Sequence, residues 1–355
     1  MIYIILALAI LLFCLGLAGY LYEKQAARHD FERLRPPGRR IQVGDHALYL
    51  LAMGDRRPGQ PLVVLESGHG DWSRAWGKVQ PAIAEFARVV SYDRAGFGWS
   101  DSGPRPRTPL QIITELHELL EKAGERPPYL LVGHSMGGPF SRLFFSRYPQ
   151  EVAGMVWVDS AHEELPRYIP FWKSAMVNFL IFIQLAALLA RLGFVRLAGR
   201  RLILSAFPSV RDPQAQAVLV AQTAPPKFFD ALIDETRQMV QTKNWSHAPA
   251  SLGELPVISI EAQYPSKAPP RYPPKQWAEF RAGWQAIHQD LSNISTNLRR
   301  IPAPTGHVVM AEQPLLVIQA TREMLDLLTV SKPQPPFASP GTGSSSSTRL
   351  SITQE

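Results

Sequence analysis

The sequence predicts an α/β fold in which a mostly parallel β-sheet is flanked by helices. Over residues 41–160, short apolar segments alternate with longer stretches at helical spacing, and the alternation resumes over 255–330. A turn of the form G-x-S-x-G at 133–137 stands between a strand pattern and a helical pattern. Residues 161–254 are helical in character and show no clear strand pattern. These features predict one α/β core interrupted by a helical insertion.

Composition and charge limit the class of protein. At 355 residues, the chain has room for one large α/β domain with an insertion or for two modest domains. Cys14 is the only cysteine, which excludes an intrachain disulfide, a cysteine metal cluster and a thiol nucleophile in the soluble part. Much of the basic excess behind the net charge of +7 lies just after the N-terminal apolar segment. The sequence shows no nucleic-acid-binding motif. We therefore expect a membrane partner and no nucleic acid.

Residues 1–22 are predicted to form a transmembrane anchor. The segment 2–22 carries no charge, and as a helix it would be about 30 Å long, enough to cross a bilayer core. A cleaved signal peptide is the alternative. The length of the segment, the lack of a preceding basic residue and the lack of a small-residue cleavage site favour a retained anchor. The flank at 23–40 is a basic linker, which by the positive-inside rule places the soluble domain in the cytoplasm.

The first half of the core begins with an edge hairpin. Residues 41–52 alternate loosely and turn at Gly44 and Asp45, which predicts two antiparallel strands. The following elements alternate between strand and helix patterns: a strand at 61–66, a helix at 79–88, a strand at 89–92, a helix at 110–123 and a strand at 156–158.

The turn at 133–137 lies between an apolar strand at 128–132 and a helix that begins near Gly138. Strand, sharp turn and helix form the context in which a serine is exposed as a nucleophile. Glycines at 133 and 137 let the two elements pass close together, and we expect the turn to force Ser135 into a strained backbone conformation. The N-terminus of the helix would favour negative charge that develops beside this hydroxyl.

The insertion at 161–254 is predicted to form a helical cap or lid, with an uncharged apolar segment at 174–190. A second transmembrane helix is one interpretation of that segment. It is near the lower length limit, however, and it contains Asn178 and Gln184. We favour a lid helix that faces both the pocket and the bilayer surface, and a well-buried cap helix stays open as an alternative.

The core resumes after the insertion. The patterns predict a strand at 255–260, a proline-rich loop at 264–274, a helix at 277–291, a strand at 298–301 and a closing helix at 314–328. From residue 331 the composition turns to proline, glycine and serine, which predicts a disordered tail at 331–355.

Four segments in this order resemble the landmarks of the α/β-hydrolase superfamily: SGHG at 67–70, YDRAGFGWS at 92–100, GHSMGG at 133–138 and GH at 306–307. The resemblance covers roughly residues 41–330. It implies the α/β-hydrolase fold, with 161–254 as its cap and Ser135 as its nucleophile. Ser67 departs from the pattern, because the superfamily usually has a histidine there. That histidine is usually structural, so the departure does not bear on catalysis.

The same resemblance implies partners for the serine, which is a weak nucleophile until a base removes its proton. In this fold the base follows the last strand, where His307 stands, and its place after Ser135 in chain order agrees with that role. The backbone N–H groups of Met136, after the nucleophile, and of His69, after the third strand, stand where the fold supplies its oxyanion donors.

The acid that would orient His307 has two candidates. Glu261 lies near the usual place after the seventh strand, but no Gly-x-x-Asp pattern accompanies it. Asp159, at the tip of the sixth strand, is a location that some members of the superfamily use, and we favour it narrowly. Asp290 lies in a helical pattern and would point the wrong way unless that helix ends early. We interpret Asp93 and Arg94 as scaffold for the loop after the fourth strand.

These features predict a membrane-anchored serine hydrolase, esterase-like or lipase-like, that cleaves an ester, thioester or related acyl bond without a cofactor or metal. The apolar anchor and lid favour a small acyl substrate that is lipid-like. The oligomeric state is unknown at this stage. A dehalogenase is disfavoured, because residue 135 is serine and not aspartate. A binding scaffold without activity stays open, as does a proline-iminopeptidase-like peptidase. The peptidase would need an acidic cluster in the cap, for which the candidates are Glu163, Glu164, Asp230, Asp234 and Glu235.

Overall fold

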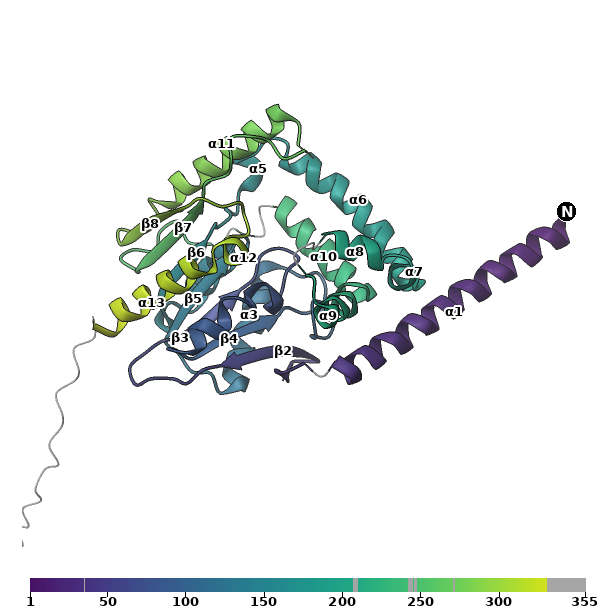
Figure 1. Cartoon of the computed structure of the whole chain (residues 1–355), viewed down its shortest axis with the longest axis horizontal. Helices are drawn as coiled ribbons and strands as arrows, with labels where there is room; N and C mark the ends of the chain where they lie inside the picture. The colour runs from purple at the N-terminus through teal and green to yellow at the C-terminus, as the bar shows by residue number, and fades with distance from the viewer. Residues whose placement is uncertain (35, 207–209, 242–244, 246–247, 271, 331–355) are drawn as a thin grey trace, which may run out of the picture.

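A single β-sheet forms the centre of the molecule (Figure 1). The computed structural model describes residues 1–34, 36–206, 210–241, 245, 248–270 and 272–330, and its strands lie in the order β1-β2-β4-β3-β5-β6-β7-β8. β1 and β2 form an antiparallel edge hairpin, β2 pairs antiparallel with β4, and the remaining pairs are parallel. The strands are β1 (Arg39–Val43), β2 (His46–Met53), β3 (Leu62–Glu66), β4 (Val89–Asp93), β5 (Tyr129–His134), β6 (Val152–Val158), β7 (Val257–Ala262) and β8 (Leu298–Ala303).

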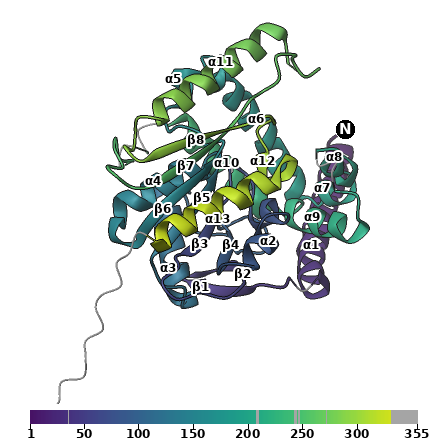
Figure 2. The same cartoon turned by 60° about the vertical axis from the view of Figure 1, so that its left-hand side comes forward.

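Helices flank the sheet and form the insertion between β6 and β7. Figure 2 shows α13 lying across one face of the sheet. The helices are α1 (Ile2–Leu34), α2 (Gln80–Ala84), α3 (Pro109–Ala123), α4 (Gly137–Arg147), α5 (Leu165–Tyr168), α6 (Trp172–Arg191), α7 (Phe194–Leu197), α8 (Arg200–Ala206), α9 (Pro213–Thr223), α10 (Pro226–Val240), α11 (Pro274–Leu291), α12 (Val309–Glu312) and α13 (Pro314–Val330), with 3-10 turns η1 (Ser73–Trp76) and η2 (Pro149–Glu151).

Most predicted elements are confirmed with shifted ends, and two differ more. The edge hairpin predicted at 41–52 is present as β1 and β2. The helix predicted at 79–88 is shorter, because α2 ends at Ala84 and a turn must lead into β4. The segment predicted as a linker, 23–40, is helical as far as Leu34, since its side chains form ion pairs with the cap. The tail at 331–355 lies outside the described residues.

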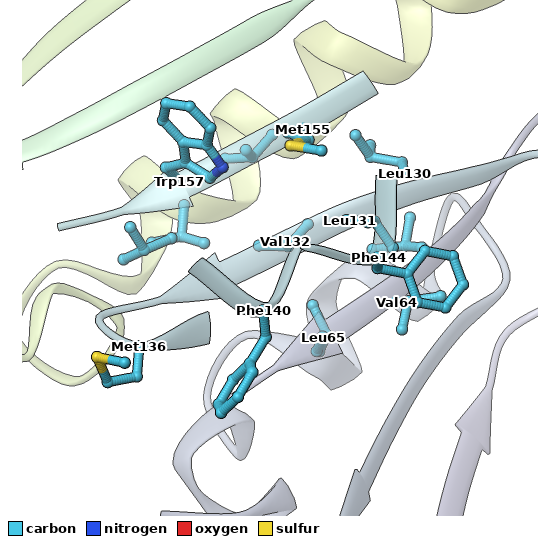
Figure 3. Packing of buried hydrophobic residues seen from close by; sticks show 14 of the residues in the cluster. Val64, Leu65, Leu130, Leu131, Val132, Met136, Phe140, Phe144, Met155 and Trp157 are labelled. Atoms are coloured by element: carbon cyan, nitrogen blue, oxygen red, sulfur yellow. The ribbon is translucent and has the colours of Figure 1, made fainter. Parts of the chain in front are cut away.

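The core is densest around β5, the strand that leads to Ser135. Every residue of β5 is buried between β3 and β6. Figure 3 shows its apolar side chains packed with those of β3, β6 and α4, namely Val64, Leu65, Leu130, Leu131, Val132, Phe140, Phe144, Met155 and Trp157. Since each fully buried apolar side chain of this size contributes about 1.5–3 kcal/mol, the strand and helix on either side of Ser135 are held rigidly.

Helices α5 to α10 form a cap over one edge of the sheet (Figure 1). α6 packs against α10, and only Ile183, Ala187 and Ala190 of α6 are buried. The alternative of a well-buried cap helix is therefore wrong. Two ion pairs tie α10 to loops of the core: Arg94 with Glu235, and Arg105 with Asp234. These ties fix the cap above the carboxyl ends of the strands.

Candidate active site

Ser135 occupies the sharp turn between β5 and α4. Its φ of +52° lies in the left-handed region that residues other than glycine rarely adopt, so the predicted strain is confirmed. A Cβ on Gly133 would lie 2.4 Å from the carbonyl oxygen of Gly137, and one on Gly137 would lie 2.4 Å from that of Glu66. Only glycine at both positions lets strand and helix approach this closely. The turn exposes the Ser135 side chain to a cavity beneath the cap.

His307 follows β8 and reaches Ser135 from across the sheet. Its Nε2 lies 2.9 Å from Ser135 Oγ. The backbone carbonyl of His307 lies 2.9 Å from Nε2 of His134. The His307 ring makes a T-shaped contact with the ring of Trp284, with centroids 5.0 Å apart. Burial lowers the pKa of His134 to about 3, so that ring stays neutral and donates its N–H to the carbonyl. These contacts hold the imidazole of His307 in one orientation.

Asp159 follows β6 and completes a chain of three side chains. Its Oδ2 lies 2.6 Å from His307 Nδ1, its carboxyl group is fully buried, and its φ of +48° is again left-handed. Burial by itself raises the pKa of Asp159, but the interactions with His288 and His307 outweigh it and hold that pKa well below its usual range. The group is therefore ionised at neutral pH.

The other acids considered from the sequence lie elsewhere. Glu261, the alternative acid, forms a two-pronged ion pair with Arg300 at 2.7 Å for each contact. Its nearest imidazole is that of His288, at 4.0 Å. Asp290 accepts a hydrogen bond from the hydroxyl of Tyr168. The structure brings neither carboxylate to His307.

The residues that surround Asp159 were not predicted from the sequence. The Tyr264 hydroxyl donates to Oδ2 over 2.6 Å and lies 3.1 Å from His307 Nδ1. Oδ1 accepts from the Ala262 backbone N–H at 3.0 Å and from Trp284 Nε1 at 2.9 Å, with His288 Nε2 also at 3.0 Å. Trp284 and His288 are four residues apart on α11, so one helix face delivers both. That spacing is the one signal by which the sequence could have indicated them.

The loop after β3 carries His69, one of the two predicted oxyanion donors. His69 Nε2 lies 2.9 Å from the Thr236 hydroxyl of α10, and burial lowers the pKa of this ring. Met136 precedes α4 directly, so its N–H stands at the N-terminus of that helix. Within the described part of the chain, neither backbone N–H donates a hydrogen bond to another group. Both therefore stay candidates for the two oxyanion donors that the sequence predicts.

Arg94 holds the His69 loop in place. Its guanidinium, 2% exposed, donates to the backbone carbonyls of Ser67 and Gly68 at 2.9 and 2.7 Å. It also pairs with Glu66 at 2.8 Å and with Glu235 of α10 at 2.7 Å. The buried guanidinium of Arg94 thus holds the His69 loop in position and joins it to α10 of the cap.

The fold and the sequence agree with known families. Residues 61–195 match the family model described as the alpha/beta hydrolase fold. The solved structure of the epoxide hydrolase CorEH superimposes with a TM-score of 0.59 at 21% identity, covering 82% of this chain and 99% of that one. This chain has the α/β-hydrolase fold. Ser135 and Asp159 directly follow the strands β5 and β6, and His307 lies in the loop that follows β8.

Two curated proteins match this chain over part of its length. An AB hydrolase superfamily protein of Gibberella zeae is 37% identical over 123 residues, which cover 33% of this chain and 38% of that protein. An uncharacterized vacuolar membrane protein of Saccharomyces cerevisiae is 34% identical over 110 residues, covering 30% and 17% respectively. The chain spans less than half the length of the first curated relatives that it matches.

A cavity of about 730 Å³ contains the Ser135 and His307 side chains. Its walls are mostly apolar and aromatic, and they come from α6, α11 and the loop after β7: Trp172, Met176, Phe179, Tyr264, Tyr272, Trp277, Phe280 and Trp284. The rings of Trp277, Phe280 and Trp284 stack in sequence along α11. Among the described residues, no group of three or more ligating side chains could hold a metal ion. The cavity suits an apolar substrate of moderate size.

Proposed function

We propose that this chain is a membrane-anchored serine hydrolase that cleaves an ester, thioester or related acyl bond. The observation that carries the proposal is the hydrogen-bonded chain from Ser135 through His307 to Asp159 beside an apolar cavity. A serine hydrogen-bonded to an imidazole, itself oriented by a buried carboxylate, is the arrangement that activates a hydroxyl for acyl transfer.

The reaction follows from these contacts. His307 Nε2 takes the proton of Ser135 as Oγ attacks the carbonyl carbon of the substrate, and Asp159 stabilises the imidazolium that forms. The N–H groups of Met136 and His69 bind the oxyanion. His307 then gives its proton to the leaving alcohol or thiol, and the acyl group stays on Ser135. Water, deprotonated by His307, releases the acid and restores the serine.

The competing functions have less support. A peptidase that recognises a free amine needs unpaired acids in the cap. Glu163, Asp234 and Glu235 form ion pairs with arginines of the chain, and so do the more exposed Glu164 and Asp230. A silent scaffold would not need a strained serine within hydrogen-bonding distance of an imidazole. The uncharged part of α1, residues 2–22, and the similarity to a vacuolar membrane protein support the anchor, and the basic residues after residue 22 favour a cytoplasmic domain.

Labelling with a fluorophosphonate probe tests this function. We expect the full-length protein in detergent to label at Ser135, and Ser135→Ala to show no labelling while its circular dichroism spectrum is unchanged. Turnover of nitrophenyl esters of increasing acyl length would then define the preferred chain. A folded wild-type protein that neither labels nor turns over any ester of the series would refute the proposal.

A further inference from the structure

Helix α6 has two apolar faces with different surroundings. The inner face carries Trp172, Met176 and Phe179, which line the cavity that contains Ser135. The outer face carries large apolar side chains that recur at helical spacing and are exposed: Val177, Ile181, Phe182, Leu185, Leu188 and Leu189. A soluble protein rarely exposes so continuous an apolar stripe without a partner.

The exposed stripe continues onto the next two helices. Phe194 and Leu197 of α7 and Leu202 of α8 are each more than half exposed. Arg200 and Arg201, also exposed, stand among them on α8. Exposed apolar side chains next to arginines are typical of helices that lie in the plane of a membrane surface and meet anionic head groups.

Helix α1 packs directly against the end of this surface. A Cβ on Gly19 would lie 2.1 Å from the backbone oxygen of Leu192, and one on Gly193 would lie 2.8 Å from the backbone oxygen of Gly19. Glycine at both positions is therefore what lets α1 touch the turn between α6 and α7. Such close helix contacts through small residues are the usual way in which membrane helices associate.

A buried charge cluster fixes the same junction. Arg196 of α7 pairs with Glu23 of α1 at 2.8 and 2.9 Å and also with Asp30 of α1, and the side chains of Arg196 and Glu23 are buried. This cluster holds α1 to the cap. Beyond it the uncharged part of α1 projects away from the core, and Figure 1 shows α6 running across the direction of α1.

We propose that the outer face of α6, together with α7 and α8, rests in the bilayer that α1 enters, and that acyl substrates reach Ser135 from the bilayer past α6. The occupant of this face is lipid, because the face is continuous with the uncharged part of α1, none of which is buried, and because arginines border it. The docking stands on this geometry alone, whereas the substrate route also rests on the proposed hydrolase function.

The docking is tested by the depth of a probe in vesicles. Cys14, the single cysteine, is replaced by serine, and a nitrobenzoxadiazole label is placed on Leu185→Cys. Leu315→Cys on α13 is the matched control, since Leu185 and Leu315 are 58% and 68% exposed. The full chain is reconstituted into phosphatidylcholine and phosphatidylglycerol vesicles with or without doxyl-labelled lipid. We expect the label at 185 to be quenched about threefold more than the label at 315.

Equal quenching at the two positions would overturn the docking. Protection of the label at 185 without quenching would also overturn it if an unlabelled sample of Leu185→Cys forms cross-links between two chains, because a second copy would then cover the face. Either result is independent of any enzymatic activity.

The substrate route is tested with a double variant, Ile181→Glu with Leu185→Glu, and the control Leu315→Glu. We expect the double variant to hydrolyse a long-chain ester embedded in vesicles about tenfold more slowly and to hydrolyse soluble nitrophenyl butyrate within about twofold of wild type. The control should match wild type on both esters. An equal loss on both, or no loss on the embedded ester, would overturn the route. A wild type without esterase activity would refute the hydrolase function and the route together, and the quenching result would still decide the docking.

Discussion

Replacing Asp159 by asparagine tests which carboxylate orients His307. Asparagine keeps the shape of the side chain but presents one oxygen and one NH₂ group where the carboxylate presents two oxygens. Donors face both oxygens of Asp159: Trp284 Nε1 and the Ala262 N–H on one side, the Tyr264 hydroxyl and His307 on the other. The amide NH₂ must therefore face donors in either orientation.

The size of the effect follows from the tautomer of His307. With the NH₂ group opposite Nδ1, that nitrogen must accept a hydrogen bond, so the ring proton moves to Nε2. The Nε2 atom, 2.9 Å from Ser135 Oγ, can then no longer take the serine proton. In a serine hydrolase, a base held in the wrong tautomer lowers kcat by about 10³–10⁴-fold, equivalent to about 4–5.5 kcal/mol of transition-state stabilisation.

The assay compares kcat for a short nitrophenyl ester in wild type, Asp159→Asn and Glu261→Gln. We expect the large loss in Asp159→Asn alone. Glu261→Gln should lose less than about tenfold, because Glu261 pairs with Arg300 and not with His307. Near-ultraviolet circular dichroism identifies variants that fail to fold. A folded Asp159→Asn that retains a tenth or more of the wild-type rate, with a large loss in Glu261→Gln, would refute the assignment.

Two further variants probe the surroundings of the site. Arg94→Met should lower the free energy of unfolding by about 3–5 kcal/mol, because it leaves the buried carboxylates of Glu66 and Glu235 unpaired, and chemical denaturation measures this. The exposed pair of Arg167 with Glu164 is the control, and an equal loss in Arg167→Ala would contradict the reasoning. His134 has a pKa of about 3 in the folded protein and near 6.5 in the unfolded chain. As the pH falls from about 6.5 towards about 3, the unfolded chain therefore binds a proton at His134 that the folded protein does not bind, and the free energy of unfolding decreases. Between pH 7 and pH 5 this group should remove about 2 kcal/mol of stability, and His134→Gln should lose less over the same range.

The sequence predicts the parts of the site that local pattern determines. Ser135 is fixed by two glycines and by the strand and helix around them, and all of these lie within a few residues of one another. His307 follows the last strand, so chain order is enough to select it. The backbone donors at Met136 and His69 depend on the path of the chain rather than on side chains, which is why their positions can be proposed without knowing any contact.

The acid and the supporting residues depend on contacts that cross the chain. Asp159 and Glu261 lie at the ends of neighbouring strands β6 and β7, so chain order alone cannot choose between them. Asp159 has a left-handed φ, and its carboxylate contacts His307. The hydrophobic periodicity of the sequence does not indicate this backbone conformation. Arg94 is recognisable from the sequence only as scaffold. Its carboxylate partners, Glu66 and Glu235, are far apart in sequence and become apparent only in three dimensions.

The placement of the acid on β6 has a consequence for the pocket. β5 and β6 are adjacent and parallel, with His134 opposite Val158, so Ser135 and Asp159 leave the sheet side by side. The position after β7 is thereby free of a catalytic carboxylate, and Tyr264 occupies it. Its hydroxyl binds Asp159, and its ring makes T-shaped contacts with Trp277, Phe280 and Trp284 of α11. Orientation of the base and the aromatic character of the pocket wall therefore depend on the same side chain, and a substitution of Tyr264 would alter rate and substrate preference together.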